Sequence, residues 1–134
     1  MKKILFSLVI LLSVCGCTTS KLVATKPYEE QKSSAGNRVV ANVKGEINGL
    51  YLFYWIPLWS GEPWRPNERD YDTFTHYVTP AYMSRMLDNY RRRHKYDAVE
   101  DLEINRVNRG WWSLGILWVR SIYGSAVMTE KMKK

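Results

Sequence analysis

A single amphipathic helix over residues 79–95 constrains the fold of this chain more than any other feature of its sequence. Thr79 suits the N-cap position, and Pro80 suits the first helical position because its missing N–H would have no partner there. Apolar residues then recur at helical spacing, at Met83, Met86, Leu87 and Tyr90. A lone helix with one apolar stripe must bury that stripe against another element, and a β-sheet is the expected partner.

The hydrophobic segments that precede the helix have the composition of β-strands. Residues 39–43 predict one strand, which Lys44 and Gly45 are expected to break or to distort into a bulge. Residues 50–56 are apolar or aromatic at every position. This run predicts a strand that is covered on both faces, or whose second face meets lipid or a partner, and Pro57 should end its regular pairing.

The segment after the helix predicts another strand, over residues 98–108. Its alternation is imperfect. Strict period-two counting places Leu102 and Ile104 on one face of the strand and Val99 and Val107 on the other. We therefore expect this strand to have a mixed rather than a clearly buried face.

Residues 111–128 form a second apolar stretch, in which Arg120 is the only charged residue. An arginine near the centre of a membrane span costs about 2.5–3.5 kcal/mol, so we interpret the stretch as a two-strand hairpin or one long bent strand. The complete pattern predicts a single α+β domain over residues 38–130, with a frayed tail at 131–134. Its architecture should be a small, mainly antiparallel sheet with one amphipathic helix packed on one face.

The N-terminal segment has the pattern of an export signal. Lys2 and Lys3 precede the apolar run 4–14, which is too short for a bilayer that requires roughly 20 apolar residues. The run closes with Val14-Cys15-Gly16-Cys17, which resembles the lipobox of bacterial lipoproteins, whose cysteine is lipidated. An alternative register ends at Cys15, but it puts the bulky Val14 where glycine or alanine belongs.

The lipobox resemblance implies that residues 1–16 are removed as a signal peptide. Cys17 would then carry a diacylglyceryl thioether and an N-acyl group, which anchors the exported protein to the cell envelope. Thr18 after the lipidated cysteine implies the outer membrane rather than the inner one. Residues 17–37 are rich in Thr, Ser, Lys, Glu and Gln, and we expect them to form a flexible tether.

The order of elements behind the lipobox is also similar to that of small prophage Bor-type and TRL-like envelope lipoproteins. The similarity covers residues 45–129 and rests on the architecture and on glycines at Gly49, Gly110, Gly115 and Gly124. These lipoproteins have no established catalytic residues, so the resemblance implies none in this chain.

Cysteine content and charge narrow the possible functions. Both cysteines belong to the targeting segment, so processing at Cys17 leaves the domain without disulfides, thiolate nucleophiles or thiolate metal sites. Removing Lys2 and Lys3 lowers the formal net charge from +7 to about +5. Export argues against nucleic acid as the partner of this modest positive charge. The expected partners are the membrane, anionic lipid or lipopolysaccharide, or another envelope protein, and no cofactor is expected beyond the covalent lipid.

Two groups of residues are candidates for contact with lipid or a partner. One contains tryptophans at the ends of the apolar segments: Trp59, Trp64, Trp111 and Trp112. The other is the basic end of the helix: Arg91, Arg92 and Arg93. Each group has a structural alternative, because tryptophans can serve only as core and arginines favour the negative end of a helix dipole.

The polar loop over residues 67–76 supports an alternative hypothesis. Asp70, Asp72 and His76 could ligate a divalent cation, and Glu68 with the two aspartates could supply the carboxylate pair of a hydrolase. Asp and His are common in loops, and the sequence contains no Gly-x-Ser-x-Gly or His-Glu-x-x-His motif. We therefore expect a non-enzymatic binding or scaffolding lipoprotein, with a hydrolase or metal-dependent enzyme as the alternative.

Overall fold

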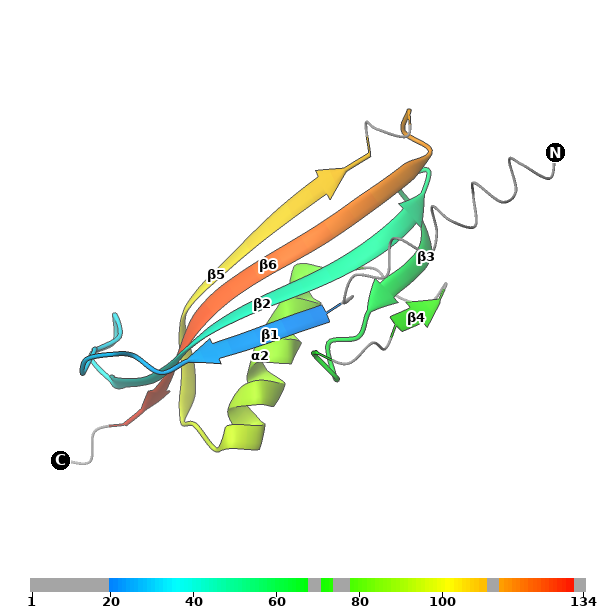
Figure 1. Cartoon of the computed structure of the whole chain (residues 1–134). Helices are drawn as coiled ribbons and strands as arrows, with labels where there is room; N and C mark the ends of the chain where they lie inside the picture. The colour runs from blue at the N-terminus through cyan, green and yellow to red at the C-terminus, as the bar shows by residue number, and fades with distance from the viewer. Residues whose placement is uncertain (1–19, 68–70, 74–77, 111–113, 132–134) are drawn as a thin grey trace.

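The structure is a computed structural model that describes residues 20–67, 71–73, 78–110 and 114–131 of the chain. The elements are β1 (Ser20–Thr25), β2 (Arg38–Leu52), β3 (Ile56–Gly61), β4 (Tyr71–Thr73), α2 (Pro80–His94), β5 (Ala98–Arg109) and β6 (Leu117–Glu130). All strand pairs are antiparallel, in the order β4-β3-β2-β6-β5, and α2 packs on one face of the sheet (Figure 1). The predicted α+β architecture is confirmed.

Strand β2 is the centre of the sheet. Along one side it pairs with β6 over nearly its whole length, and along the other it pairs first with β1 and then with β3. The predicted break at Lys44 and Gly45 is wrong, because β2 runs through both residues without interruption. One strand therefore joins the two strands that the sequence suggested.

Gly45 lies within β2 because the helix approaches the sheet closely there. An added Cβ at Gly45 would overlap the side chains of Met83 and Met86, and one at the paired Gly124 of β6 would overlap Met83. Both methionines are fully buried, as is Leu87 beside them. The predicted apolar stripe of the helix is confirmed, and the two glycines make room for it.

The ends of α2 match the sequence expectation in position but not in every contact. Thr79 occupies the N-cap with an extended backbone, yet its side chain makes no capping hydrogen bond. At the other end Lys95 adopts the left-handed conformation, and its N–H donates to helical carbonyls. A left-handed residue at this position is a common way to end a helix.

The apolar run 50–56 is a hairpin rather than one strand. β2 ends at Leu52, residues 53–55 turn, and β3 begins at Ile56. Phe53 and Tyr54 have φ of 50° and 76°, values that favour glycine. Neither residue type is typical of such a turn, so the sequence does not indicate it. Pro57 does not end the pairing, because it lies inside β3 opposite Tyr51.

The predicted tether over residues 17–37 is wrong for its described part. Ser20–Thr25 forms β1, and Leu22 packs into the core beneath the helix. The connection from β1 to β2 is also fixed, since Ser33 and Asn37 donate hydrogen bonds to the carboxylate of Glu100, and Ser34 donates to that of Asp101. The described part of the predicted tether therefore belongs to the folded domain.

The carboxylates that hold this connection belong to an irregularity in β5. The register between β5 and β6 shifts between Glu100 and Glu103, and Asp101 has a φ of 51°. The predicted faces of β5 are wrong because of this bulge. Val99 and Ile104 both pack against the core cluster, whereas Leu102 is exposed. One inserted residue reverses the alternation that strict counting assumes.

Strand β6 settles the interpretation of the second apolar stretch. Leu117–Glu130 is one long strand, so a hairpin within it is excluded, and residues 111–113 lie outside the described part. No helix among the described residues is long and apolar enough to cross a membrane. Of the predicted tail, Lys131 is described, and its N–H donates to Asp97 at 2.8 Å.

Candidate interaction surfaces

One candidate surface joins the loop after β3 to the helix. Trp64 is 43% exposed, and the guanidinium of Arg85 lies 5.9 Å from the centre of its ring. Arg93, on the same helix, donates a hydrogen bond to the carbonyl of Trp64 at 3.1 Å. Two of the predicted contact residues, Trp64 and Arg93, are thus brought together. Arg85, which belongs to the same helix as Arg93, joins them. We call these three residues the Trp64 surface.

The guanidinium of Arg85 lies beside two aromatic rings. It is 5.9 Å from the ring centre of Tyr82 as well as from that of Trp64. Among the described residues, neither Arg85 nor Arg93 makes an ion pair. Arginines placed beside an indole without a carboxylate keep donors that a phosphate or carboxylate can accept.

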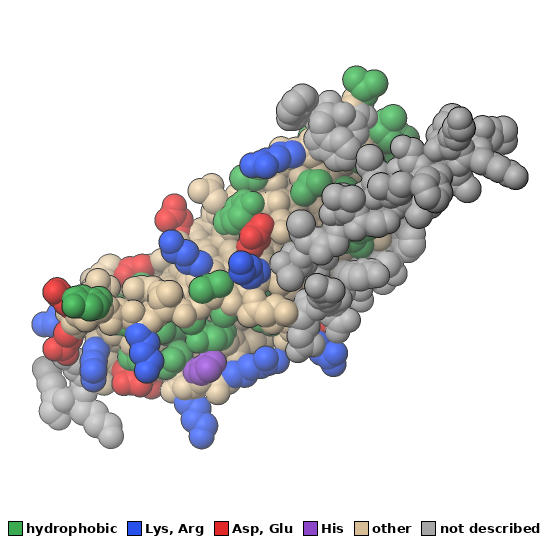
Figure 2. Space-filling view, in the orientation of Figure 1, with side chains coloured by type: hydrophobic (Ala, Val, Ile, Leu, Met, Phe, Trp, Pro, Cys, Tyr) green, Lys and Arg blue, Asp and Glu red, His purple; other side chains and the backbone are tan. Residues whose placement is uncertain are grey.

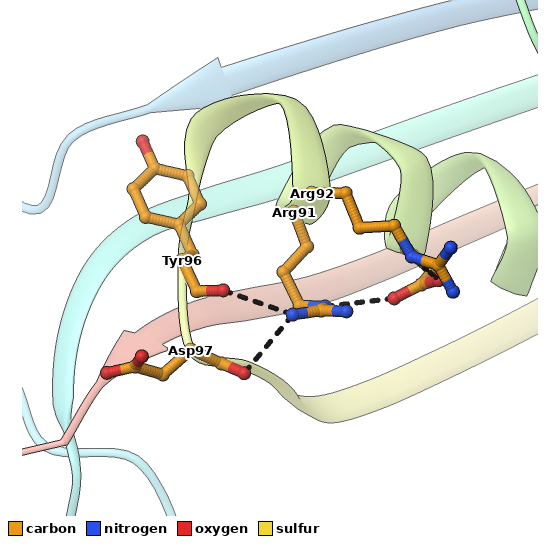
Figure 3. A network of polar contacts seen from close by, with 5 residues as sticks. Arg91, Arg92, Tyr96 and Asp97 are labelled. Carbon is orange, nitrogen blue, oxygen red and sulfur yellow. Dashed lines mark hydrogen bonds and ion pairs between the residues drawn. The ribbon is translucent and has the colours of Figure 1, made fainter.

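The other two predicted arginines have partners within the domain (Figure 3). Arg91 donates to Asp88 at 2.9 Å and to the carbonyls of Tyr96 and Asp97 at 3.2 and 3.3 Å. Arg92 pairs with the second oxygen of Asp88 at 2.8 Å. The hydrogen bond from Arg91 is the main cause that lowers the pKa of Asp88. Arg91 therefore fastens the end of the helix to the start of β5.

A second candidate surface lies where two turns meet, at the upper right of Figure 1. The N–H of Phe53, in the β2–β3 turn, donates to the carbonyl of Ile116, in the β5–β6 connection, at 2.7 Å. Around this bond large apolar side chains stand in solvent, with Leu114 94% and Trp55 67% exposed. We define the hairpin-tip surface by its exposed residues: Phe53, Trp55, Ile56, Leu114 and Ile116.

Beside the hairpin-tip surface, arginines and aromatic rings form a compact cluster. The guanidinium of Arg120 lies 4.4 Å from the ring centre of Tyr51 and 5.0 Å from that of Tyr54. Arg106 donates to the hydroxyl of Tyr54 at 3.1 Å, and Trp118 packs edge-to-face on the same tyrosine at 5.1 Å. The Nε of Arg120 is buried and has no hydrogen-bond partner among the described residues.

Charge is distributed unevenly along the sheet. In residues 47–61 and 104–129 the only charged side chains are those of Arg106, Arg109 and Arg120. Figure 2 shows hydrophobic side chains standing out at the upper right end, whereas the acidic side chains in view lie over the middle and the other end. These two segments therefore carry apolar and cationic side chains but no acidic ones.

Several predicted site residues lie outside the described part of the chain: Cys15, Cys17, Glu68, Asp70, His76, Trp111 and Trp112. Asp72 is in β4, where its backbone pairs with Ser60. Trp59 is half-buried in β3, opposite Leu50 of β2. Across the described residues, no three His, Cys, Asp or Glu side chains are close enough to hold a metal ion.

The sheet face opposite the helix bears a shallow open depression of about 250 Å³. Its polar lining comes from Lys44, Glu103, Asn105, Tyr123 and Ser125. It is smaller than the usual range of ligand pockets, about 300–1,000 Å³, and its one lysine and one glutamate give it no net charge. Its small volume and lack of net charge make this depression a weaker candidate for ligand binding than either exposed surface.

Sequence reasoning missed most of the hairpin-tip surface and, of the two arginines beside Trp64, it missed Arg85. Phe53, Trp55 and Ile56 were assigned to a strand because no glycine or asparagine marked the turn. Arg85 could have been found, because it follows Tyr82 by three residues on the exposed side of the helix.

Comparison with known proteins gives no match for this chain, whether by family model, curated sequence or solved structure. The lipobox resemblance therefore stays a prediction from the N-terminal residues.

Proposed function

We propose that this protein is a lipid-anchored, non-enzymatic binding module of the cell envelope that holds an anionic partner on its Trp64 surface. The observation that carries the proposal is the meeting of Trp64 with Arg85 and Arg93. Their elements are separated in sequence, yet Arg93 bonds directly to the Trp64 backbone and Arg85 lies over its ring. An indole with two arginines provides both apolar area and bidentate donors.

The chemistry of the surface favours a carboxylate-bearing or phosphate-bearing group of an envelope component. Tryptophan and arginine are enriched at the energetic centres of interfaces, because each combines a large contact area with directional hydrogen bonds. Anchoring supports the same function, since a lipid on Cys17 would concentrate the domain and its partner on one membrane. Binding then requires no catalytic group.

The anchor is tested by acyl labelling of the full-length protein in cells. Cys17→Ser should abolish palmitate incorporation and release the domain from the membrane fraction, whereas Cys15→Ser should leave both unchanged. Labelling that survives Cys17→Ser would contradict the proposed anchor position.

The partner surface is tested by placing a photo-crosslinking amino acid at Trp64 in the anchored protein. We expect a discrete adduct that is lost when Arg85→Gln and Arg93→Gln are combined. Lys26→Gln combined with Lys131→Gln is the matched control, because it also removes two exposed positive charges, one in the β1–β2 connection and one just after β6. The proposed surface would be refuted if the adduct forms equally well in the double arginine variant, or if no adduct forms with both arginines intact.

A further inference from the structure

We infer that the hairpin-tip surface is a second membrane attachment site, which inserts into the headgroup and acyl-chain boundary of the bilayer that holds the Cys17 lipid. The inference rests on the proposed lipid anchor and extends it. It assigns the hairpin-tip surface to lipid, and it leaves the Trp64 surface for the anionic partner.

The composition of the tip fits a lipid interface. Five large apolar side chains are exposed there, and one of them, Leu114, is almost wholly in solvent at 94%. Exposed apolar clusters of this kind mark sites of protein or membrane contact. Tryptophan is also the residue that favours the membrane–water interface, and Trp55 is 67% exposed.

The backbone of the tip is built to expose these side chains. Phe53, Tyr54 and Leu114 all have positive φ, with values of 50°, 76° and 54°. Non-glycine residues rarely adopt this conformation, and each such residue costs free energy that the surrounding structure must offset. The hydrogen bond from Phe53 to Ile116 holds the two turns together, so their apolar side chains form one surface.

The charge beside the tip selects an anionic lipid surface as the occupant. Arg106, Arg109 and Arg120 are the only charged residues in 47–61 and 104–129, the segments that contribute β3, part of β5 and most of β6 to the sheet. Arg106 and Arg120 both contact Tyr54, which lies within the β2–β3 turn itself. Basic residues next to an inserted apolar tip attract anionic headgroups.

The position of β1 brings the tip to the bilayer. Two residues lie between Cys17 and Ser20, so three Cα–Cα steps give a reach of at most about 11 Å. β1 is antiparallel to β2 and starts opposite Ile47, so the chain enters β1 from the side of the tip. From Ile47 to the end of β2 at Leu52 is about 17 Å along the strand. With the sheet upright and the chain from Cys17 to Ser20 fully extended toward the tip, the tip would reach about 6 Å deeper than Cys17, within the 5–10 Å typical of interfacial insertion.

The experiment uses the acylated full mature chain, reconstituted in vesicles of phosphatidylcholine and phosphatidylglycerol, with one environment-sensitive dye on an introduced thiol. In Leu114→Cys the dye should shift to the blue and be quenched several-fold more by nitroxide-labelled lipids than in Tyr28→Cys. Tyr28 is the matched control because it is fully exposed and lies in the β1–β2 connection, at the opposite end of the sheet.

Charge placed in the tip provides a second readout that does not depend on dye position. Ile116→Asp should reduce the quenching at residue 114 to the level of the Tyr28 control, while Val23→Asp, at an exposed position of β1, should not change it. Equal, water-like signals at residues 114 and 28 would overturn the inference. A blue shift without lipid quenching would also overturn it, in favour of contact between two copies of the chain.

Flotation of the same vesicles separates this inference from the proposed anchor. Protein that fails to float unless Cys17 is acylated, yet shows no lipid contact at residue 114, retains the anchor and refutes the inserted tip. If protein isolated from cells carries no lipid on Cys17, the proposed anchor is refuted. The quenching measured at residue 114 after vesicles are added to that protein then tests the tip alone.

Discussion

The two ends of the sheet are formed by the same long strands but differ in the side chains that they expose. At the tip end, two turns expose apolar side chains and hold them beside arginines that have aromatic rings rather than carboxylates as neighbours. At the other end, which we call the bulge end, the carboxylates of Glu100 and Asp101 bind the polar β1–β2 connection. The bulge end satisfies these two carboxylates within the domain, whereas the tip end exposes apolar surface beside arginines.

The difference shows that exposure and order are separate properties. The tip residues are exposed but belong to defined turns, and the segment expected to be flexible is held by five hydrogen bonds to side chains of β5 and to its own residues. Polar composition predicts solvation rather than mobility. A serine-rich loop becomes ordered when a bulge presents carboxylates to it.

The largest effect is expected from Tyr51→Phe at the tip end. Tyr51 is fully buried, and its hydroxyl accepts a hydrogen bond from the N–H of Val78 at 2.6 Å. Removing the hydroxyl leaves that buried N–H without this partner, at a cost of about 1–3 kcal/mol. Chemical denaturation measures the free energy of unfolding, and Tyr123→Phe on the exposed sheet face is the control, for which little change is expected.

A smaller effect should follow from Arg120→Met, which keeps an apolar stem but removes the charge. Two ring contacts, each worth about 0.5–1 kcal/mol at a partly exposed site, predict a loss of roughly 1–2 kcal/mol in stability. Arg106→Met should cost less, because Arg106 is exposed and bonds only to the rim of Tyr54. Equal thermal unfolding midpoints for the two variants would break the view that Arg120 supports the tip from within.

The sequence predicts the elements that follow local rules, and it does not predict those that depend on strand pairing. The helix was predictable because Pro80 and the methionines each follow a local rule. The turn at Phe53 and Tyr54 was not, since its positive φ values are imposed by strand pairing on residues that do not favour them. The faces of β5 were mispredicted for a similar reason, because a single inserted residue at Asp101 reverses the alternation.

The candidate surfaces were predictable only in part. Trp64 and Arg93 were identified as contact residues by their types, and the fold then placed them together. Nothing in the sequence marks the pairing of Phe53 with Ile116, because it joins two turns that are distant along the chain. Contacts of this kind depend on the register of the whole sheet.

The smallest effect is expected at the bulge end and concerns pH. Hydrogen bonds from Ser33 and Asn37 lower the pKa of Glu100 below its usual 4.5, and those from Ser34 lower the pKa of Asp101 below 3.8. A lowered folded-state pKa stabilises the connection above the usual values, and this stabilisation is lost as the pH falls below about 4.5 and through the lowered values. Because both carboxylates are exposed, the loss should remain local.

Amide NMR shifts followed during acid titration measure this effect. The Ser34 N–H, which donates to Asp101, should shift with the carboxylates, whereas the Val78 N–H at the tip end should not. In Asp101→Asn the shift of Ser34 should be much reduced. A Ser34 amide that is insensitive to pH would remove the proposed contrast between the two ends.

The place of β1 in the sheet also determines how the domain would resist force. Its six residues pair with residues 42–47 of β2, and its first residue faces the tip end. The hydrogen bonds of an antiparallel pair are perpendicular to the strands. A load transmitted from a lipid at Cys17 would therefore run along β1 and shear all of its hydrogen bonds together, rather than open them one at a time. The short strand would act as a mechanical clamp between the membrane and the rest of the domain.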